Sequence, residues 1–298
     1  MNRQFIKMFE AFDRFGDWYD RQKRDNFAIY GLVFTLFVVS IVLGLFVYVS
    51  IAGFPRLGSR FFSGYASRIP EQAGILPALI GSLWVLVLVF IISFPLGLAA
   101  GIQLEKYVTN TRWARLLEVN ITNLAGIPSV IYGLLGLQFF VRGMALGESV
   151  LGASLTLSLM VLPLVIVSTR EALRMVPNSV SEAAYALGAT KWQTIWYHAL
   201  PIAFPGVVSG VLLAISRAIG EAAPLLVIGA VAFVPFSPAS IFDYFTVLPV
   251  QIFFWATKPQ ASFLINASAA ILVLLSLTLL LNLLAVRIRE RWHKRIES

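Results

Sequence analysis

Six long apolar stretches, separated by polar or charged residues, dominate the hydropathy pattern of this 298-residue chain. A helix that crosses a bilayer needs about 20 consecutive apolar residues. The pattern therefore predicts an all-α membrane protein with six transmembrane helices. The third stretch is the weakest, because polar side chains such as Asn120, Thr122 and Gln138 interrupt it. The stretches are residues 27–51, 76–103, 119–141, 150–169, 206–231 and 263–286.

Glycines and prolines inside these stretches predict how the helices pack. Two pairs of glycines lie four residues apart, a spacing that lets two membrane helices approach closely. One proline in each of four stretches predicts either a break beside a polar path or an ordinary kink. The glycine pairs are Gly97 with Gly101 and Gly206 with Gly210, and the prolines are Pro95, Pro128, Pro163 and Pro224.

One segment between the fourth and fifth stretches, residues 182–201, favours a helix without being plainly apolar. It predicts a first helix over residues 182–187, followed by a left-handed stop at Gly188. A second short helix would be capped by Thr190 and ended by Pro201. Small residues on one arm and aromatic residues on the other predict a hairpin that docks into a partner protein.

Two further segments are neither typical spans nor free loops. Residues 1–26 carry charges of both signs and predict a cytoplasmic amphipathic segment. Its expected surface anchors are Phe5, Phe9, Phe12 and Trp18. Residues 232–262 are aromatic and interrupted by proline, which predicts an interfacial or re-entrant helix.

Composition narrows the class of protein. The chain is 58% hydrophobic with a mean hydropathy of +0.82, which excludes a soluble globular domain. It has no cysteine, so disulfides and thiolate metal sites are excluded. The net charge is +8, but in a membrane protein the distribution of the charges matters more than their sum. No nucleic-acid partner is therefore expected.

The distribution of basic residues predicts the orientation. With the N-terminus inside, the inner segments carry 17 Lys and Arg and the outer segments carry 5. The remaining one, Arg217, lies within the fifth stretch. Because basic residues accumulate on the cytoplasmic side, both termini and the hairpin are expected in the cytoplasm.

Arg217 and Glu221 are the sharpest candidates for chemistry. A charge within a membrane span costs several kcal/mol unless it faces protein or water. Four residues apart, the two side chains would share a helix face and pair. They form either a structural ion pair or a polar lining that meets an anion, with Arg217 as donor and Glu221 holding it. The second interpretation is favoured.

Other polar residues have two interpretations each. Arg170, Glu171 and Arg174, just past the fourth stretch, form either an inner mouth of the same path or a basic anchor at a helix end. Asn123 and Ser129, around the interrupted third stretch, offer hydrogen bonds to an ion or serve as helix caps.

The sequence carries no energy source for concentrative transport. It contains no G-x-x-x-x-G-K-S/T phosphate loop and no H-E-x-x-H motif. Moving a divalent anion inward against a membrane potential costs about 4.6 kcal/mol per 100 mV. A coupled ion or a partner ATPase would have to supply this free energy.

The hairpin resembles the cytoplasmic loop of type I ABC-importer membrane subunits. The resemblance rests on Glu182-Ala183-Ala184, Gly188 and Leu200-Pro201, whereas His198 stands where that family usually has Ile. Residues 122–133 and 216–225 resemble phosphate permeases, and residues 245–252 are similar to the PstA-type subunit family. The resemblance covers about residues 75–286, with residues 27–51 as an extra span and 287–298 as a basic cytoplasmic tail.

The resemblance implies a type I ABC-importer permease fold and a non-catalytic subunit of an ATP-driven phosphate importer in the bacterial inner membrane. Its implied partners are a homologous C-type permease, two copies of a cytoplasmic ATP-binding subunit and an extracytoplasmic phosphate-binding protein. No cofactor is implied. The alternatives are a permease for sulfate, molybdate or tungstate, a stand-alone ion-coupled carrier or channel, and a membrane scaffold without transport.

Overall fold

The computed structural model describes the backbone of residues 3–108, 112–231 and 233–297, and the side chains of 27–108, 112, 115–231 and 233–291. Within these ranges the regular structure is helical, apart from one isolated antiparallel bridge between Ser149 and Tyr244. The chain divides into two compact units, Met1–Ile51 and Ala52–Ser298. The predicted all-α class is confirmed.

The first unit consists of one long helix, α1 (Arg3–Gly53), which continues to the start of the second unit. The described part of the charged segment, residues 3–26, and the first apolar stretch are therefore continuous in one helix. From Phe27 onward α1 is apolar on all sides, as expected of a helix surrounded by lipid. The expected anchors Phe5, Phe9, Phe12 and Trp18 lie outside the described side chains.

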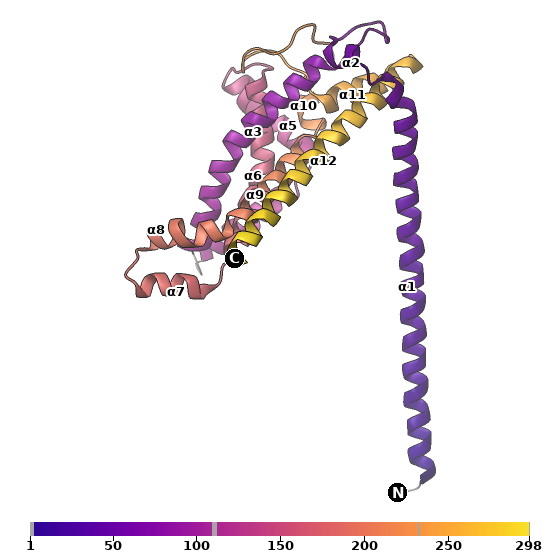
Figure 1. The fold of residues 1–298 in the computed structure, drawn as a ribbon, viewed down its shortest axis with the longest axis vertical. Coiled ribbons are helices and arrows are strands. Elements are labelled where there is room, and N and C mark those ends of the chain that lie inside the picture. The colour runs from indigo at the N-terminus through magenta and orange to yellow at the C-terminus, as the bar shows by residue number, and fades with distance from the viewer. Residues whose placement is uncertain (1–2, 109–111, 232, 298) are drawn as a thin grey trace. The chain divides into compact units, whose positions relative to one another are not determined.

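The second unit is a bundle of helices with short connections (Figure 1). Three of its helical segments are π-helical and continue or precede an α-helix. Its elements are η1 (Phe54–Arg56), α2 (Ser59–Ser63), α3 (Leu76–Ile102), η2 (Gln103–Tyr107), α4 (Arg112–Ala125), α5 (Ser129–Gly136), η3 (Leu137–Gly143), α6 (Val150–Arg174), α7 (Asn178–Ala186), α8 (Lys191–Gln193), η4 (Thr194–Ala199), α9 (Leu200–Ala218), α10 (Ala223–Ile228), α11 (Leu248–Ala256) and α12 (Ala261–Glu297).

Five helices of the described chain are long and apolar enough to cross a membrane, and a bent pair makes six. The bent pair, Arg115–Ala125 and Ser129–Gly143, turns by 99° and corresponds to the weak third stretch. The turn falls at Pro128, which lacks an N–H and disfavours helical geometry in the residue before it. The five others are Phe27–Arg56, Leu76–Tyr107, Val150–Arg174, Lys191–Ala218 and Ala261–Arg291.

Helix α6 lies at the centre of the second unit, between α3 and α9. Both predicted glycine pairs lie against it, which confirms the close approach that their spacing predicts. A Cβ atom at any of the four glycines would clash with α6. The separations would be 2.4 Å for Gly97 to Val165 Cγ1, 2.6 Å for Gly101 to Thr169 Cβ, 2.9 Å for Gly206 to Ala172 Cβ and 2.3 Å for Gly210 to Ser168 Cβ.

The four prolines divide evenly between breaks and continuous helices. Pro128 and Pro224 mark breaks, and Pro224 lies in the first turn of α10, where a missing N–H removes no helical hydrogen bond. Pro95 and Pro163 lie inside the continuous helices α3 and α6. At these two positions the first alternative, a break, is therefore not what the structure shows.

The fifth span begins earlier than predicted. Helix α8, the π-helical η4 and α9 form one run, Lys191–Ala218, so the second arm of the hairpin is the start of the span. Pro201 lies in the first turn of α9 and does not end the arm, contrary to the prediction. The π-helical segment before it takes up the change in hydrogen bonding that a proline imposes.

Residues 232–262 contain one short helix, α11, in their described part. Its nine residues are too few to cross a bilayer, in agreement with the predicted interfacial or re-entrant helix. The Leu248 N–H donates a hydrogen bond of 2.9 Å to Ser82 Oγ of α3, and Trp255 is buried near Phe263 of α12.

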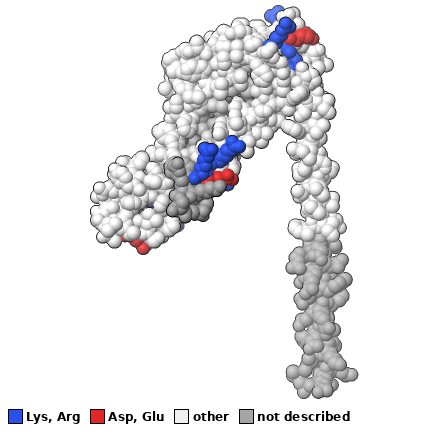
Figure 2. Space-filling view, in the orientation of Figure 1, with Lys and Arg blue, Asp and Glu red and all other residues white. Residues whose placement is uncertain are grey.

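Charged side chains of the second unit gather toward two ends on the face that Figure 2 shows. A broad band between them carries none on this face. This distribution fits a unit that crosses a membrane, because lysine, arginine and carboxylate side chains are costly in the hydrocarbon layer.

Candidate functional site

The hairpin between α6 and α9 has the predicted local structure. Gly188 adopts a left-handed conformation, with φ of +83°, after the end of α7. Thr190 caps α8: the Gln193 N–H donates to Thr190 Oγ1 at 3.3 Å, and the Thr190 N–H donates to Gln193 Oε1 at 2.8 Å. The stop and the cap, both predicted, are therefore confirmed.

The hairpin is held by a small buried contact and exposes much apolar surface. Ala184 and Leu200, 5% and 7% exposed, are the buried members of the predicted coupling set. Glu182, Ala183, Gly188 and Pro201 are exposed. The large apolar side chains Leu187, Trp192 and Tyr197 are also exposed. Figure 1 shows α7 and α8 side by side, at the end of the unit opposite α2 and α11.

The prediction placed Arg217 and Glu221 in the middle of the fifth span, and this was wrong. In the structure they lie at the end of a span. Helix α9 ends at Ala218, and Glu221 belongs to the break before α10. The pair is still formed, with Arg217 Nε 3.8 Å from Glu221 Oε1. Two hydrogen bonds to carbonyl oxygens at the helix end, from the Gly220 and Glu221 N–H groups, keep the chain turning and so bring the two side chains together.

The Arg217 side chain is 50% exposed in this single chain, whereas that of Glu221 is 19% exposed. The small Gly220 beside the pair would favour a close approach of another helix, but a Cβ atom there would meet only the Arg217 carbonyl oxygen, at 3.6 Å, so no such approach occurs. The guanidinium therefore faces outward from the unit and is available to a ligand or to another subunit.

The break after α9 lies beside the break before α5. A Cβ atom at Gly133, in the second turn of α5, would lie 2.7 Å from Pro224 Cα in the first turn of α10, so the two helices touch there. Ser129 lies one turn before Gly133, and Glu221 lies three residues before Pro224. The two broken spans therefore touch at Gly133 and Pro224, and we call this contact the junction; along the chain, Ser129 and Glu221 lie within about one turn of it.

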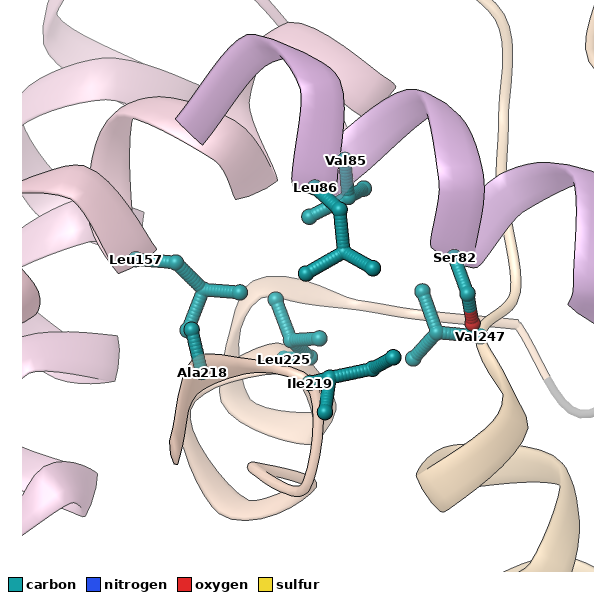
Figure 3. A pocket seen from close by; sticks show the side chains of 8 residues that line it. All are labelled: Ser82, Val85, Leu86, Leu157, Ala218, Ile219, Leu225 and Val247. Carbon is teal, nitrogen blue, oxygen red and sulfur yellow. The ribbon is translucent and has the colours of Figure 1, made fainter. Parts of the chain in front are cut away.

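The interior side of this junction is a small apolar pocket (Figure 3). None of the eight residues around it is charged, and the Ser82 hydroxyl already accepts the Leu248 N–H. The pocket is therefore unsuited to an anion. It is lined by Ser82, Val85, Leu86, Leu157, Ala218, Ile219, Leu225 and Val247.

The two remaining predicted path residues lie on α4 and α6. Asn123 is exposed near the end of α4, before the 99° bend. Arg170 lies on α6 at the level of Gly206 and Gly210 of α9, because these glycines contact Ala172 and Ser168 on either side of it. At 1.5 Å per residue, that level is roughly 10–16 Å along α9 from Arg217.

Arg170 belongs to a cluster of four charges toward the hairpin end of α6. Glu105 Oε2 lies 3.5 Å from Arg170 Nε and 3.2 Å from Arg174 Nε. Glu118 Oε1 lies 3.2 Å from Arg170 Nη1 and 3.5 Å from Arg174 Nη2. Two positive and two negative charges thus alternate around a ring, which we call the inner ion cluster. Glu171, predicted beside the two arginines, is exposed and lies outside it.

Sequence reasoning missed Glu105 and Glu118, although one signal was present. Both acidic residues lie at the cytoplasmic ends of predicted stretches, the side to which the basic-residue count assigns Arg170 and Arg174. Unlike charges on the same membrane side are candidates for pairing.

The fold, the hairpin and the broken spans are those of a known class. The chain belongs to the family of binding-protein-dependent transport system inner membrane components, whose profile matches residues 93–297. It is therefore a multi-pass membrane permease component, which confirms the expected class.

Relatives extend the comparison within this family. The chain is 35% identical over 227 residues to the phosphate transport system permease protein PstA 1 of Mycobacterium tuberculosis, covering 74% of this chain and 73% of that protein. It is 31% identical over 269 residues to the probable ABC transporter permease protein YqgI of Bacillus subtilis, covering 86% and 89%. The predicted resemblance to the PstA-type family is confirmed.

A solved structure confirms the predicted type I importer fold. A chain of a bacterial alginate ABC transporter, in complex with an alginate pentasaccharide-bound periplasmic protein, is similar with a TM-score of 0.63. The match covers 87% of this chain and 94% of that chain at 15% identity, so it speaks for the fold alone.

Proposed function

We propose that this chain is the permease subunit of an ATP-driven importer of inorganic phosphate across the bacterial inner membrane. The observation that carries the proposal is its 35% identity to a phosphate transport system permease over about three quarters of both chains. The Arg217–Glu221 pair, close to the junction where the two broken spans touch, supports the proposal with chemistry suited to an anion.

In this proposal Arg217 meets the phosphate. A guanidinium offers several N–H donors in a planar fork, which suits the oxygens of a tetrahedral anion. Glu221 holds Arg217 at the junction, and Ser129 can donate a hydroxyl hydrogen bond from the neighbouring helix. Arg170 belongs to the inner end of the same path, where the inner ion cluster neutralises it. Asn123, which lies between Glu118 of the inner ion cluster and Ser129 in the sequence, completes the proposed path.

The hairpin is proposed as the docking site of the ATPase, which hydrolyses ATP for this non-catalytic chain. Its exposed apolar side chains and the exposed Glu182, Ala183 and Gly188 form the contact surface, while Ala184 and Leu200 hold the hairpin in shape. The remaining proposed partners are a homologous C-type permease, a second ATPase copy and an extracytoplasmic phosphate-binding protein. The 17-to-5 distribution of basic residues supports cytoplasmic termini.

The deciding experiment is uptake of radiolabelled phosphate by the purified complex in vesicles, with the binding protein outside and ATP inside. We expect ATP-dependent uptake that unlabelled phosphate suppresses and sulfate does not. Suppression by sulfate but not by phosphate would assign another oxyanion, and uptake that persists without ATP would assign a stand-alone carrier or channel.

A further inference from the structure

The inner ion cluster is more elaborate than a helix anchor requires. It joins three segments, because Glu105 belongs to η2, Glu118 to α4, and both arginines to α6. The Arg170 side chain is only 10% exposed and that of Glu105 only 15%. Burying ion pairs is weak evidence for stability, since apolar residues of similar volume often stabilise a protein equally well.

The geometry of the cluster allows two arrangements. Each carboxylate is shared between both arginines, at nearly the same pair of distances, 3.2 and 3.5 Å. Glu118 can therefore move toward either arginine while Glu105 moves toward the other, and no charge loses its partner. A segment with two arrangements of similar energy is the physical element that coupling between distant sites requires.

The segment η2, which carries Glu105 of the cluster, is also in contact with the hairpin. Lys191, the first residue of α8, places its Nζ 4.9 Å from the ring centre of Tyr107. Tyr107 belongs to η2, two residues after Glu105. Movement of the hairpin would therefore reach Glu105 through a π-helical segment, a type of helix found frequently at functional sites.

The cluster also links α4 to α6, because Glu118 of α4 pairs with both arginines. Within the second unit α4 packs mainly against α6, and many of its apolar side chains, such as Leu116 and Leu117, are exposed. The helix leads directly into the bend before α5, where the Tyr132 hydroxyl donates a 2.8 Å hydrogen bond to the Leu124 carbonyl oxygen. Shifts of α4 would thus reach the junction of the two broken spans.

We infer that Glu105 and Glu118 are positioning residues of the transport cycle. Through the inner ion cluster they convert movement of the hairpin into movement of α4, and so open or close the junction at which Arg217 lies. This inference rests on the proposed function for its substrate, but the mechanical link is independent of which anion is carried.

The first test measures ATP hydrolysed per phosphate imported by the reconstituted complex. For Glu105→Gln and Glu118→Gln we expect this ratio to rise about tenfold, a change within the usual range of coupling between sites. Glu118→Asp, which keeps the charge, should restore most of the coupling. The matched control Glu171→Gln, an exposed position at the same helix end, should leave the ratio at the wild-type value. An unchanged ratio in both variants, or a proportional loss of uptake and hydrolysis, would overturn the inference.

The second test needs no phosphate. Since the chain has no cysteine, spin labels can be placed at Leu117→Cys in α4 and Leu279→Cys in α12, both exposed. Adding ATP to the complex should change the distance between the labels, and Glu105→Gln with Glu118→Gln should abolish this change while the ATPase stays bound. An undiminished change would overturn the inference. A complex that shows the coupled movement but imports no phosphate would refute the proposed function alone.

Discussion

The accessibility of a single charged side chain in this protein depends on where its helix ends. Arg217 and Glu221 illustrate this, because the same two side chains would be buried in an uninterrupted span but lie at a break in the structure. The break leaves half of the Arg217 side chain accessible. An accessible guanidinium with one nearby carboxylate keeps donors free for a ligand, whereas a fully buried pair would be satisfied internally.

The first residue-scale prediction concerns this guanidinium. Arg217→Gln is expected to lower phosphate uptake about 100-fold, the upper range for losing a charged hydrogen bond, without affecting assembly. Uptake in vesicles and co-purification of the partner subunits measure the two effects. Arg142→Gln, which removes an exposed arginine elsewhere, is the control. Normal uptake by the Arg217 variant would remove its proposed role.

The second residue-scale prediction concerns the turn of the hairpin at Gly188. Gly188 has a φ of +83° and nothing within 4 Å of the position of a Cβ atom, so only backbone conformation disfavours a side chain there. Gly188→Val is expected to strain the turn by about 1–3 kcal/mol and to loosen the ATPase. Gly188→Asn should be tolerated, because asparagine adopts this conformation readily. The measurement is co-purification of the ATPase, and equal yields for both variants would contradict the prediction.

At the scale of elements, α6 organises the second unit through small residues on both of its neighbours. Lipid offers no hydrophobic drive for helices to associate, so close packing and hydrogen bonds must hold them. The two glycine pairs supply this packing against one central helix. The same closeness makes each contact sensitive to a single added methyl group.

We therefore predict that Gly206→Ala lowers the thermal unfolding temperature of the purified protein. The added Cβ would lie 2.9 Å from Ala172 Cβ, and overpacking of this kind costs about 1–3 kcal/mol. The exchange variant Gly206→Ala with Ala172→Gly removes the opposing Cβ and should recover much of the loss. Equal unfolding temperatures for the single and the exchange variants would show that this contact does not limit stability.

At the scale of the whole molecule, the positions of the loops relative to the membrane follow from the charge distribution. The hairpin and the outer segments lie at opposite ends of the second unit, so they must lie on opposite sides of the membrane (Figure 1). From the distribution of basic residues we predict that the hairpin lies on the cytoplasmic side.

This orientation is tested by labelling single cysteines introduced into a chain that has none. In intact cells a membrane-impermeant maleimide is expected to label Ser63→Cys, an exposed residue of α2, and not Asn178→Cys, an exposed residue of the hairpin. Permeabilised cells should label both, which controls for reactivity. Labelling of only the hairpin cysteine in intact cells would show the opposite topology and contradict the prediction.

Sequence alone predicted much of this protein, because its strongest signals are local. The number of apolar stretches, the left-handed Gly188 and the capping Thr190 each depend on local sequence, and each agrees with the structure, although the fifth span has other bounds than predicted. The spacing of the glycine pairs predicted close packing as well, since four residues make about one helical turn.

Only the tertiary structure decided where charges that are distant in the sequence meet. Glu105 and Glu118 are 13 residues apart in the sequence and more than 50 residues before Arg170 and Arg174, so no periodicity relates them. Whether a proline breaks a span also depends on its neighbours, as Pro95 and Pro128 show. Long-range pairing and the fate of a proline are properties of packing, and packing is determined by the arrangement of all the helices together.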